Sequence, residues 1–153
     1  MNYGKAFLSA LLFTLLLYSC VDQSPDVTFT PHSYSEEVNY TNPVIRGFFP
    51  DPSICSTGED YYLVTSSFEY FPGVPVFHST DLVNWEHIGN ALDRPSQLPL
   101  EGVDFSGGIW APTIRYHEGT FYIITTMMPK GQNFMVTTDD PSGSWSEPVY
   151  IEQ

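Results

Sequence analysis

Asp51 is the residue of this chain best suited to acid–base chemistry, because the prolines on both sides restrict its backbone. Pro50 and Pro52 each fix one backbone torsion next to the carboxylate. A rigidly held carboxylate that faces a pocket suits general base catalysis. The same pattern also suits a turn aspartate that accepts a hydrogen bond from a loop amide. The residues around Asp51 leave both interpretations open.

An internal repeat separates Asp51 from the scaffold around it. Two stretches resemble each other at a constant offset of 60 residues, so that residue 52 recurs as residue 112. The matching pairs are Pro52/Pro112, Ile54/Ile114, Tyr62/Tyr122, Thr65/Thr125, Val76/Val136 and Trp85/Trp145. A fixed register over several short apolar runs indicates a repeated supersecondary unit. Ala111 stands opposite Asp51 in this alignment, so the scaffold itself does not require a carboxylate there.

Each repeat predicts four short strands, which is the content of one propeller blade. The first unit predicts strands over 52–56, 61–67, 74–79 and 85–89, and the second over 111–116, 121–127, 133–138 and 145–151. Pro52 and Pro112 are placed at strand starts, because proline cannot donate to a ladder. The long connection 91–108 is a candidate functional loop. The globular part, which begins near residue 42, is thus predicted to be all-β, with blade one at about 50–90 and blade two at about 110–151.

Four sequence blocks, in order, resemble glycoside hydrolase family 43, in its β-xylosidase and α-L-arabinofuranosidase branch. They are NPVIRGFFPDPS at 42–53, TSSFEYFPGVP at 65–75, DLVNW at 81–85 and GGIWAP at 107–112. The resemblance implies a five-bladed β-propeller, of which residues 42–153 would form about the first two blades. Two blades cannot close a ring, so we expect this chain to be the front part of a larger protein.

The resemblance also implies roles for three residues. Asp51 matches the general base, and Phe68 and Trp110 match aromatic positions that line a sugar-binding subsite. An inverting glycosidase needs a second, protonated carboxylate roughly 6.5–9.5 Å from the base, to leave room for the attacking water. In this family that glutamate, and a further aspartate, come from later blades. The fragment alone is therefore expected to be inactive.

The tryptophans and one cysteine have simpler interpretations from the repeat. Trp85 and Trp145 match each other, which favours packing within the scaffold. Trp110 stands opposite Pro50 and has no aromatic counterpart, which favours contact with a ligand. Cys55 lies in an apolar strand pattern and is interpreted as a small buried residue.

Composition narrows the classes of partner that the protein can bind. Eighteen acidic and five basic residues give a net charge of −13, and aromatic residues make up 16% of the chain. Nucleic acid is therefore excluded and anionic polysaccharide disfavoured. A neutral oligo- or polysaccharide containing pentoses fits this charge. No spacing of His, Cys, Asp and Glu predicts a metal site, so no cofactor is expected, although calcium ligands from later blades are left open.

The N-terminus predicts export and a lipid anchor. Lys5 precedes an apolar run that is too short to span a bilayer, as in a signal peptide over 1–20. Leu17 to Cys20 resembles the bacterial lipoprotein box, in which the cysteine is lipidated. An ordinary secretory signal with an incidental cysteine is the alternative. Residues 21–41 are predicted to form a polar tether, and the protein is placed in the bacterial cell envelope.

Two other functions are compatible with the sequence. A non-catalytic, lipid-anchored propeller would bind glycans by stacking sugar rings on Phe68 and Trp110. The second alternative is that the fragment has no activity of its own. Asp51 favours a glycosidase that hydrolyses β-xylosides or α-L-arabinofuranosides by single displacement.

Overall fold

The computed structural model describes residues 39–152, which form strands, turns and loops. The predicted signal peptide, Cys20 and most of the predicted tether lie outside the described residues. No helix is present in the described range, and it therefore contains no helical candidate for a membrane span.

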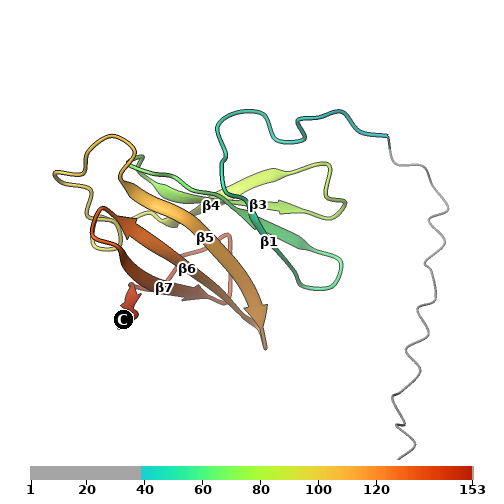
Figure 1. The fold of residues 1–153 in the computed structure, drawn as a ribbon. Coiled ribbons are helices and arrows are strands. Elements are labelled where there is room, and N and C mark those ends of the chain that lie inside the picture. The colour runs from blue at the N-terminus through green and yellow to red at the C-terminus, as the bar shows by residue number, and fades with distance from the viewer. Residues whose placement is uncertain (1–38, 153) are drawn as a thin grey trace, which may run out of the picture. The chain divides into compact units, whose positions relative to one another are not determined.

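Eight strands form two antiparallel sheets of four, each in chain order (Figure 1). The first sheet contains β1 (Ser53–Ser56), β2 (Tyr61–Val64), β3 (Gly73–Ser79) and β4 (Glu86–Leu92). The second sheet contains β5 (Gly108–His117), β6 (Thr120–Met128), β7 (Gln132–Thr138) and β8 (Val149–Tyr150). β1 packs beside β5, so the first strands of the two sheets are neighbours. The predicted all-β class, with two four-stranded units, is confirmed.

The strand registers follow the repeat through the first hairpin and then differ by one residue. Cys55 pairs with Tyr62 in the first sheet, and the residues 60 positions later, Arg115 and Tyr122, pair in the second. On the next strand, Leu63 pairs with Phe77, whereas Ile123 pairs with Val136. Val136 is therefore the structural counterpart of Phe77 rather than of Val76. The connection between β6 and β7 has a different length from the one between β2 and β3, which accounts for the shift.

Pro112 does not begin a strand, contrary to the prediction. β5 starts at Gly108, and Pro112 lies at an irregularity where the register shifts between Trp110 and Thr113. A bulge tolerates proline because residues there leave the regular ladder. Trp110 and Ala111 therefore belong to β5 itself, in the part of the strand that contacts the loop after β2 of the first sheet.

The fourth strand of the second sheet is much shorter than the predicted 145–151. The carbonyls of Trp145 and Ser146 accept hydrogen bonds from the side-chain amide of Gln97, at 3.2 and 2.8 Å. Pro148 has no N–H to donate. The connection between the sheets thus replaces part of the ladder, and Gln97 is only 1% exposed.

The paired tryptophans have different surroundings. Trp145 is buried in the core, whereas Trp85 is half-buried and its indole N–H donates to the Leu82 carbonyl at 3.0 Å. Trp145 thus packs in the core, as the expectation of scaffold packing implies, whereas Trp85 packs half-buried against its own turn. Cys55 is also half-buried rather than fully buried.

The core lies between the two sheets. Val64 and Val76 of the first sheet and Ile114 and Ile123 of the second are fully buried in one cluster. The Tyr62 and Phe121 rings meet edge to face across this boundary, with centroids 4.8 Å apart. Burial of these side chains gives the largest favourable contribution to holding the sheets together.

Candidate active site

Asp51 lies in the loop just before β1 and has an unusual backbone conformation. Its φ is +55°, in the left-handed region that non-glycine residues rarely adopt. Ala111, its counterpart in the repeat, has a φ of +44°. The two units therefore share a backbone conformation at this position, and only the first carries a carboxylate. The conformation thus belongs to the repeated scaffold, and the carboxylate is what distinguishes the first unit.

Ser66 holds the segment that carries Asp51. Its hydroxyl donates to Oδ2 of Asp51 at 2.6 Å, and its backbone N–H donates to the Pro50 carbonyl at 3.0 Å. Within residues 39–152, Oδ1 of Asp51 has no hydrogen-bond partner, and no backbone amide donates to this carboxylate. The structure thus gives no support to the interpretation of Asp51 as a loop-capping residue.

Aromatic rings gather where the loop after β2 meets β5. Phe68 lies between Phe48, with ring centroids 5.9 Å apart, and Trp110, at 6.4 Å and nearly edge to face. Trp110 is 41% exposed and Phe48 is 69% exposed, so neither is a core residue in the described range. Exposed aromatic faces of this kind can stack on sugar rings.

Backbone contacts between the sheets fix this aromatic group. Phe68 and Ile109 exchange two backbone hydrogen bonds, both of 3.0 Å, as an isolated antiparallel bridge. The indole N–H of Trp110 donates to the Ser106 carbonyl at 2.9 Å, and the Ser106 N–H donates to Glu69 at 3.1 Å. Phe68 and Trp110 are therefore brought together by the structure, Phe68 through its backbone pairing with β5 and Trp110 through its bond to the loop before β5.

Two pockets adjoin the site. One of about 350 Å³ is lined by Phe48, Phe49, Ser66, Ser67, Tyr70, Pro72, Pro75 and Asn90. A second of about 260 Å³ is lined by Phe48, Phe68, Glu69, Tyr70, Phe105 and Ser106. Phe48 and Tyr70 belong to both pockets, and Ser66 connects the first pocket to Asp51. A hollow at this place can accept a small neutral ligand.

Sequence reasoning missed Ser66, Phe48, Tyr70 and Phe105 as members of this site. The first three lie within the blocks that carry the family resemblance, so the signal was present but did not single them out. Phe105 is 86% exposed in the loop before β5, and an exposed aromatic side chain in a long connection was the available signal.

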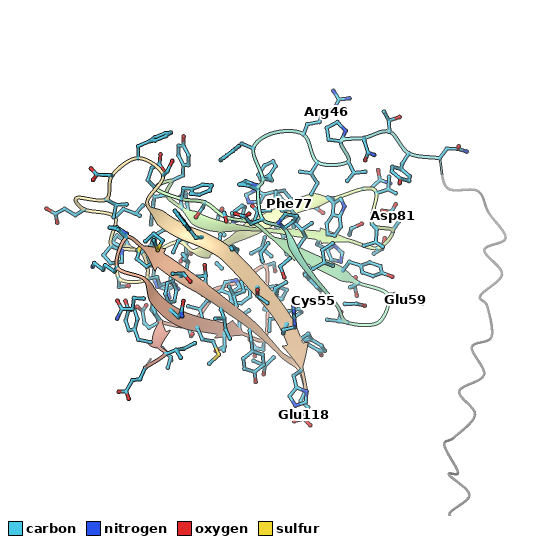
Figure 2. All side chains as sticks on the ribbon, viewed as in Figure 1. Arg46, Cys55, Glu59, Phe77, Asp81 and Glu118 are labelled. Carbon is cyan, nitrogen blue, oxygen red and sulfur yellow. The ribbon has the colours of Figure 1, made fainter. Side chains whose placement is uncertain are left out.

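Asp81 and Asp140 hold turns together. Hydrogen bonds from Asn84, first from its backbone N–H and then from its side chain, hold the pKa of Asp81 far below its ordinary value. Hydrogen bonds from Ser142, led by its hydroxyl, lower the pKa of Asp140 in the matching turn. Asp81 lies in the turn between β3 and β4 (Figure 2), whereas Asp51 lies in the loop before β1.

Cys55 and His78 lie away from the site. Burial raises the pKa of the Cys55 thiol to about 11, and the Arg115 charge opposes this rise. Figure 2 shows Cys55 on β1, towards the hairpin between β1 and β2 that Glu59 marks. Asp51 precedes the start of β1. His78 is 2.7 Å from Asp60. In the described part of the chain, no group of three or more His, Cys, Asp or Glu side chains is arranged to hold a metal ion.

Comparison with known proteins places the chain in a family. The family model "Glycosyl hydrolases family 43" matches residues 40–153. The chain therefore belongs to glycosyl hydrolase family 43, and the resemblance found in the sequence is confirmed.

Individual relatives agree with this assignment. A xylosidase/arabinosidase of Butyrivibrio fibrisolvens is 63% identical over 110 residues, which cover 72% of this chain and 21% of that protein. A non-reducing end α-L-arabinofuranosidase of Bacteroides ovatus is 57% identical over 116 residues, or 73% of this chain and 22% of that protein. The chain thus spans about a fifth of the length of these curated relatives.

Solved structures show the same fold. The xylan β-1,4-xylosidase from Bacillus halodurans C-125 has a TM-score of 0.72 at 45% identity, covering 74% of this chain and 23% of that one. The GH43B protein of a Bacteroides ovatus xyloglucan locus has a TM-score of 0.70 at 56% identity, covering 72% of this chain and 23% of that one. The predicted fold class is confirmed: the two described sheets correspond to the first blades of the family's propeller.

Proposed function

We propose that the protein containing this chain is a glycosidase that removes β-xylosyl or α-L-arabinofuranosyl groups from plant hemicellulose. The observation that carries this proposal is the Asp51 carboxylate, held through one oxygen by Ser66 and open at the other, within a site that also contains Phe68 and Trp110. The names of the relatives, which include xylosidases and an arabinofuranosidase, support the substrate class.

In this proposal Asp51 is the general base of an inverting single displacement. Oδ1 takes a proton from water while the water attacks the anomeric carbon, and Oδ2 keeps the hydrogen bond from Ser66. A protonated carboxylate on the other side of the scissile bond must protonate the leaving oxygen. We propose that this acid lies outside the two described sheets, and that the fragment alone is inactive.

The substrate is proposed to be a neutral pentoside. Phe68 and Trp110 offer apolar surface for one face of a sugar ring, and the net charge of −13 disfavours anionic chains. No cofactor is proposed for this reaction, because proton transfer by two carboxylates is sufficient for it.

Asp51→Asn in the full-length protein tests the role of the carboxylate. The amide preserves the shape of the side chain but cannot accept a proton from water at neutral pH, so turnover of an aryl β-xyloside or an aryl α-L-arabinofuranoside should fall at least about 100-fold. NMR of the first-formed sugar from the wild type should show inverted anomeric configuration. Retained configuration would refute the base role, and full activity of the variant would make Asp51 a structural residue.

A glycan-binding protein without catalytic activity is the second candidate. The aromatic group of Phe48, Phe68 and Trp110, in which Phe48 and Trp110 are exposed, favours it, because stacking alone can hold a sugar. A wild-type protein that binds xylo-oligosaccharides in calorimetry, yet releases no sugar from them over days, would establish this candidate over the enzyme.

Anchoring in the bacterial cell envelope through a lipid on Cys20 is a separate proposal. Its support is the sequence Leu17 to Cys20 after an apolar segment.

A further inference from the structure

We infer that Ser66 is a positioning residue for the reacting carboxylate, and that it ties the orientation of Asp51 to the docking of the second sheet on the first. This inference rests on the proposed function, because it assigns a role to Ser66 only if Asp51 acts as a base. It adds a residue from a different strand connection to the site, and a physical coupling between the two sheets.

The direction of each hydrogen bond at Ser66 is fixed by chemistry. The N–H of Ala111 donates to the Ser66 hydroxyl oxygen at 2.7 Å, and an amide N–H can only donate. The single hydroxyl proton is therefore available for Oδ2 of Asp51, which lies 2.6 Å away. A short hydrogen bond to a carboxylate is among the stronger ones, and a chain of two bonds polarises each member.

The hydroxyl also joins two equivalent places in the fold. Asp51 and Ala111 occupy the same position in the repeat, one before β1 and the other within β5. Ser66 is 3% exposed and lies between them. If the second sheet shifts, the Ala111 amide moves and the hydroxyl loses the partner that orients its proton. The carboxylate then loses its orientation as well.

The consequence for catalysis is a division between the two carboxylate oxygens. Ser66 occupies Oδ2, which favours one rotation of the carboxylate and leaves Oδ1, without a hydrogen-bond partner in residues 39–152, for the attacking water. A hydrogen bond that restricts the base in this way improves the geometry of proton transfer more than it improves substrate binding. Loss of the hydroxyl should therefore lower kcat and leave KM nearly unchanged.

Ser53 supplies a matched control. Its hydroxyl oxygen accepts the N–H of Ile114 at 3.2 Å, so it too links the first sheet to an amide of β5, but it makes no hydrogen bond to Asp51. Ser53→Ala removes one bond between the sheets and nothing else from the site. Ser66→Ala removes a similar bond together with the hydrogen bond to the carboxylate.

The experiment measures kcat and KM of the full-length protein on an aryl pentoside for the variants Ser66→Ala, Ser66→Thr and Ser53→Ala. We expect Ser66→Ala to lower kcat by about 10- to 100-fold, the scale of a lost hydrogen bond to a charged group, with KM within about threefold of wild type. Ser53→Ala should keep wild-type kcat. Ser66→Thr should restore most of it, because threonine keeps the hydroxyl that donates to Asp51.

A double-mutant cycle separates positioning from general destabilisation. If Ser66 acts through Asp51, adding Ser66→Ala to Asp51→Asn should cost no further residual activity. Should Ser66→Ala fold poorly by circular dichroism, Ser66→Cys carries the same comparison, since a thiol is a weak donor of similar size.

The outcomes distinguish a failure of the role of Ser66 from a failure of the proposed function. If Asp51→Asn abolishes turnover and Ser66→Ala keeps wild-type kcat, the role of Ser66 is refuted while the proposed function stands. Equal losses in Ser66→Ala and Ser53→Ala would also refute it, because the bond between the sheets would then explain both. Absence of glycosidase activity in the wild type would instead refute the proposed function.

Discussion

Gly108 is the position where a single added methyl group should do the most damage to the site. A Cβ built on Gly108 would lie 2.0 Å from the carbonyl oxygen of Phe68 and 2.4 Å from its carbon. Both atoms belong to the backbone, so no side chain can rotate away. The contact exists because Phe68 and Ile109 exchange two backbone hydrogen bonds next to Gly108. Gly108→Ala must therefore separate the two sheets at this bridge.

The cost of Gly108→Ala has two parts. The φ of Gly108 is +81°, where an L-residue pays about 1–2 kcal/mol. Loss of the two bridging hydrogen bonds adds about 0.5–1.5 kcal/mol for each. The free energy of unfolding should thus fall by about 2–5 kcal/mol. Displacement of Phe68 and Trp110 should also raise KM for an aryl pentoside.

Gly119 provides the control for the backbone part. Its φ is +87°, and a Cβ there would meet no atom within 4 Å. Gly119→Ala should therefore cost only the conformational part, about 1–2 kcal/mol, and leave KM unchanged. Urea unfolding of the full-length variants, followed by circular dichroism, measures the difference. Equal losses of stability for the two variants would refute the claim that the bridge at Phe68 requires glycine.

Three further predictions concern separate parts of the chain. Trp110→Ala should weaken pentoside binding by about 1–3 kcal/mol, measured by calorimetry, and unchanged binding would remove Trp110 from the site. Cys20→Ser should release the protein from the membrane fraction, and palmitate labelling that persists in this variant would contradict lipidation of Cys20. In that variant Cys55 should react with iodoacetamide at pH 8 far more slowly when folded than when unfolded, because burial raises the pKa of its thiol from 9.0 to about 11. Because the folded protein holds the thiol proton more tightly than the unfolded chain does, this pKa shift adds to the free energy of unfolding. The added stability is fully present below pH 9 and should be lost as the pH rises towards 11.

The sequence alone predicts those strands whose residue pattern does not depend on distant parts of the chain. Tyr61–Val64 and Thr120–Met128 are rich in β-branched and aromatic residues, and both lie within one to three residues of the predicted limits. Asp51 could be singled out because the repeat supplies Ala111 as an internal reference. These inferences need only the order of residues along the chain.

The repeat predicts which positions correspond, but it does not predict their surroundings. Val64 is fully buried because the second sheet covers it, whereas Ile124, 60 residues later, is 44% exposed on the second sheet. Trp85 and Trp145 differ for a related reason, since the connection through Gln97 reaches the segment at Trp145. Burial depends on the neighbouring element, and equal positions in two units have different neighbours.

Ser66 shows why part of the site could not be found in advance. Its role requires three groups that are distant in sequence: the Asp51 carboxylate, the hydroxyl after β2, and the Ala111 amide in β5. No periodicity marks such a residue, because the matching Thr126 donates to Asn133 within its own sheet. The carboxylate of the first unit is what gives the hydroxyl a different acceptor. The difference between Asp51 and Ala111 thus also changes the role of a neighbouring hydroxyl residue, which is Ser66 in the first unit and Thr126 in the second. This effect is visible only once the two sheets are placed side by side.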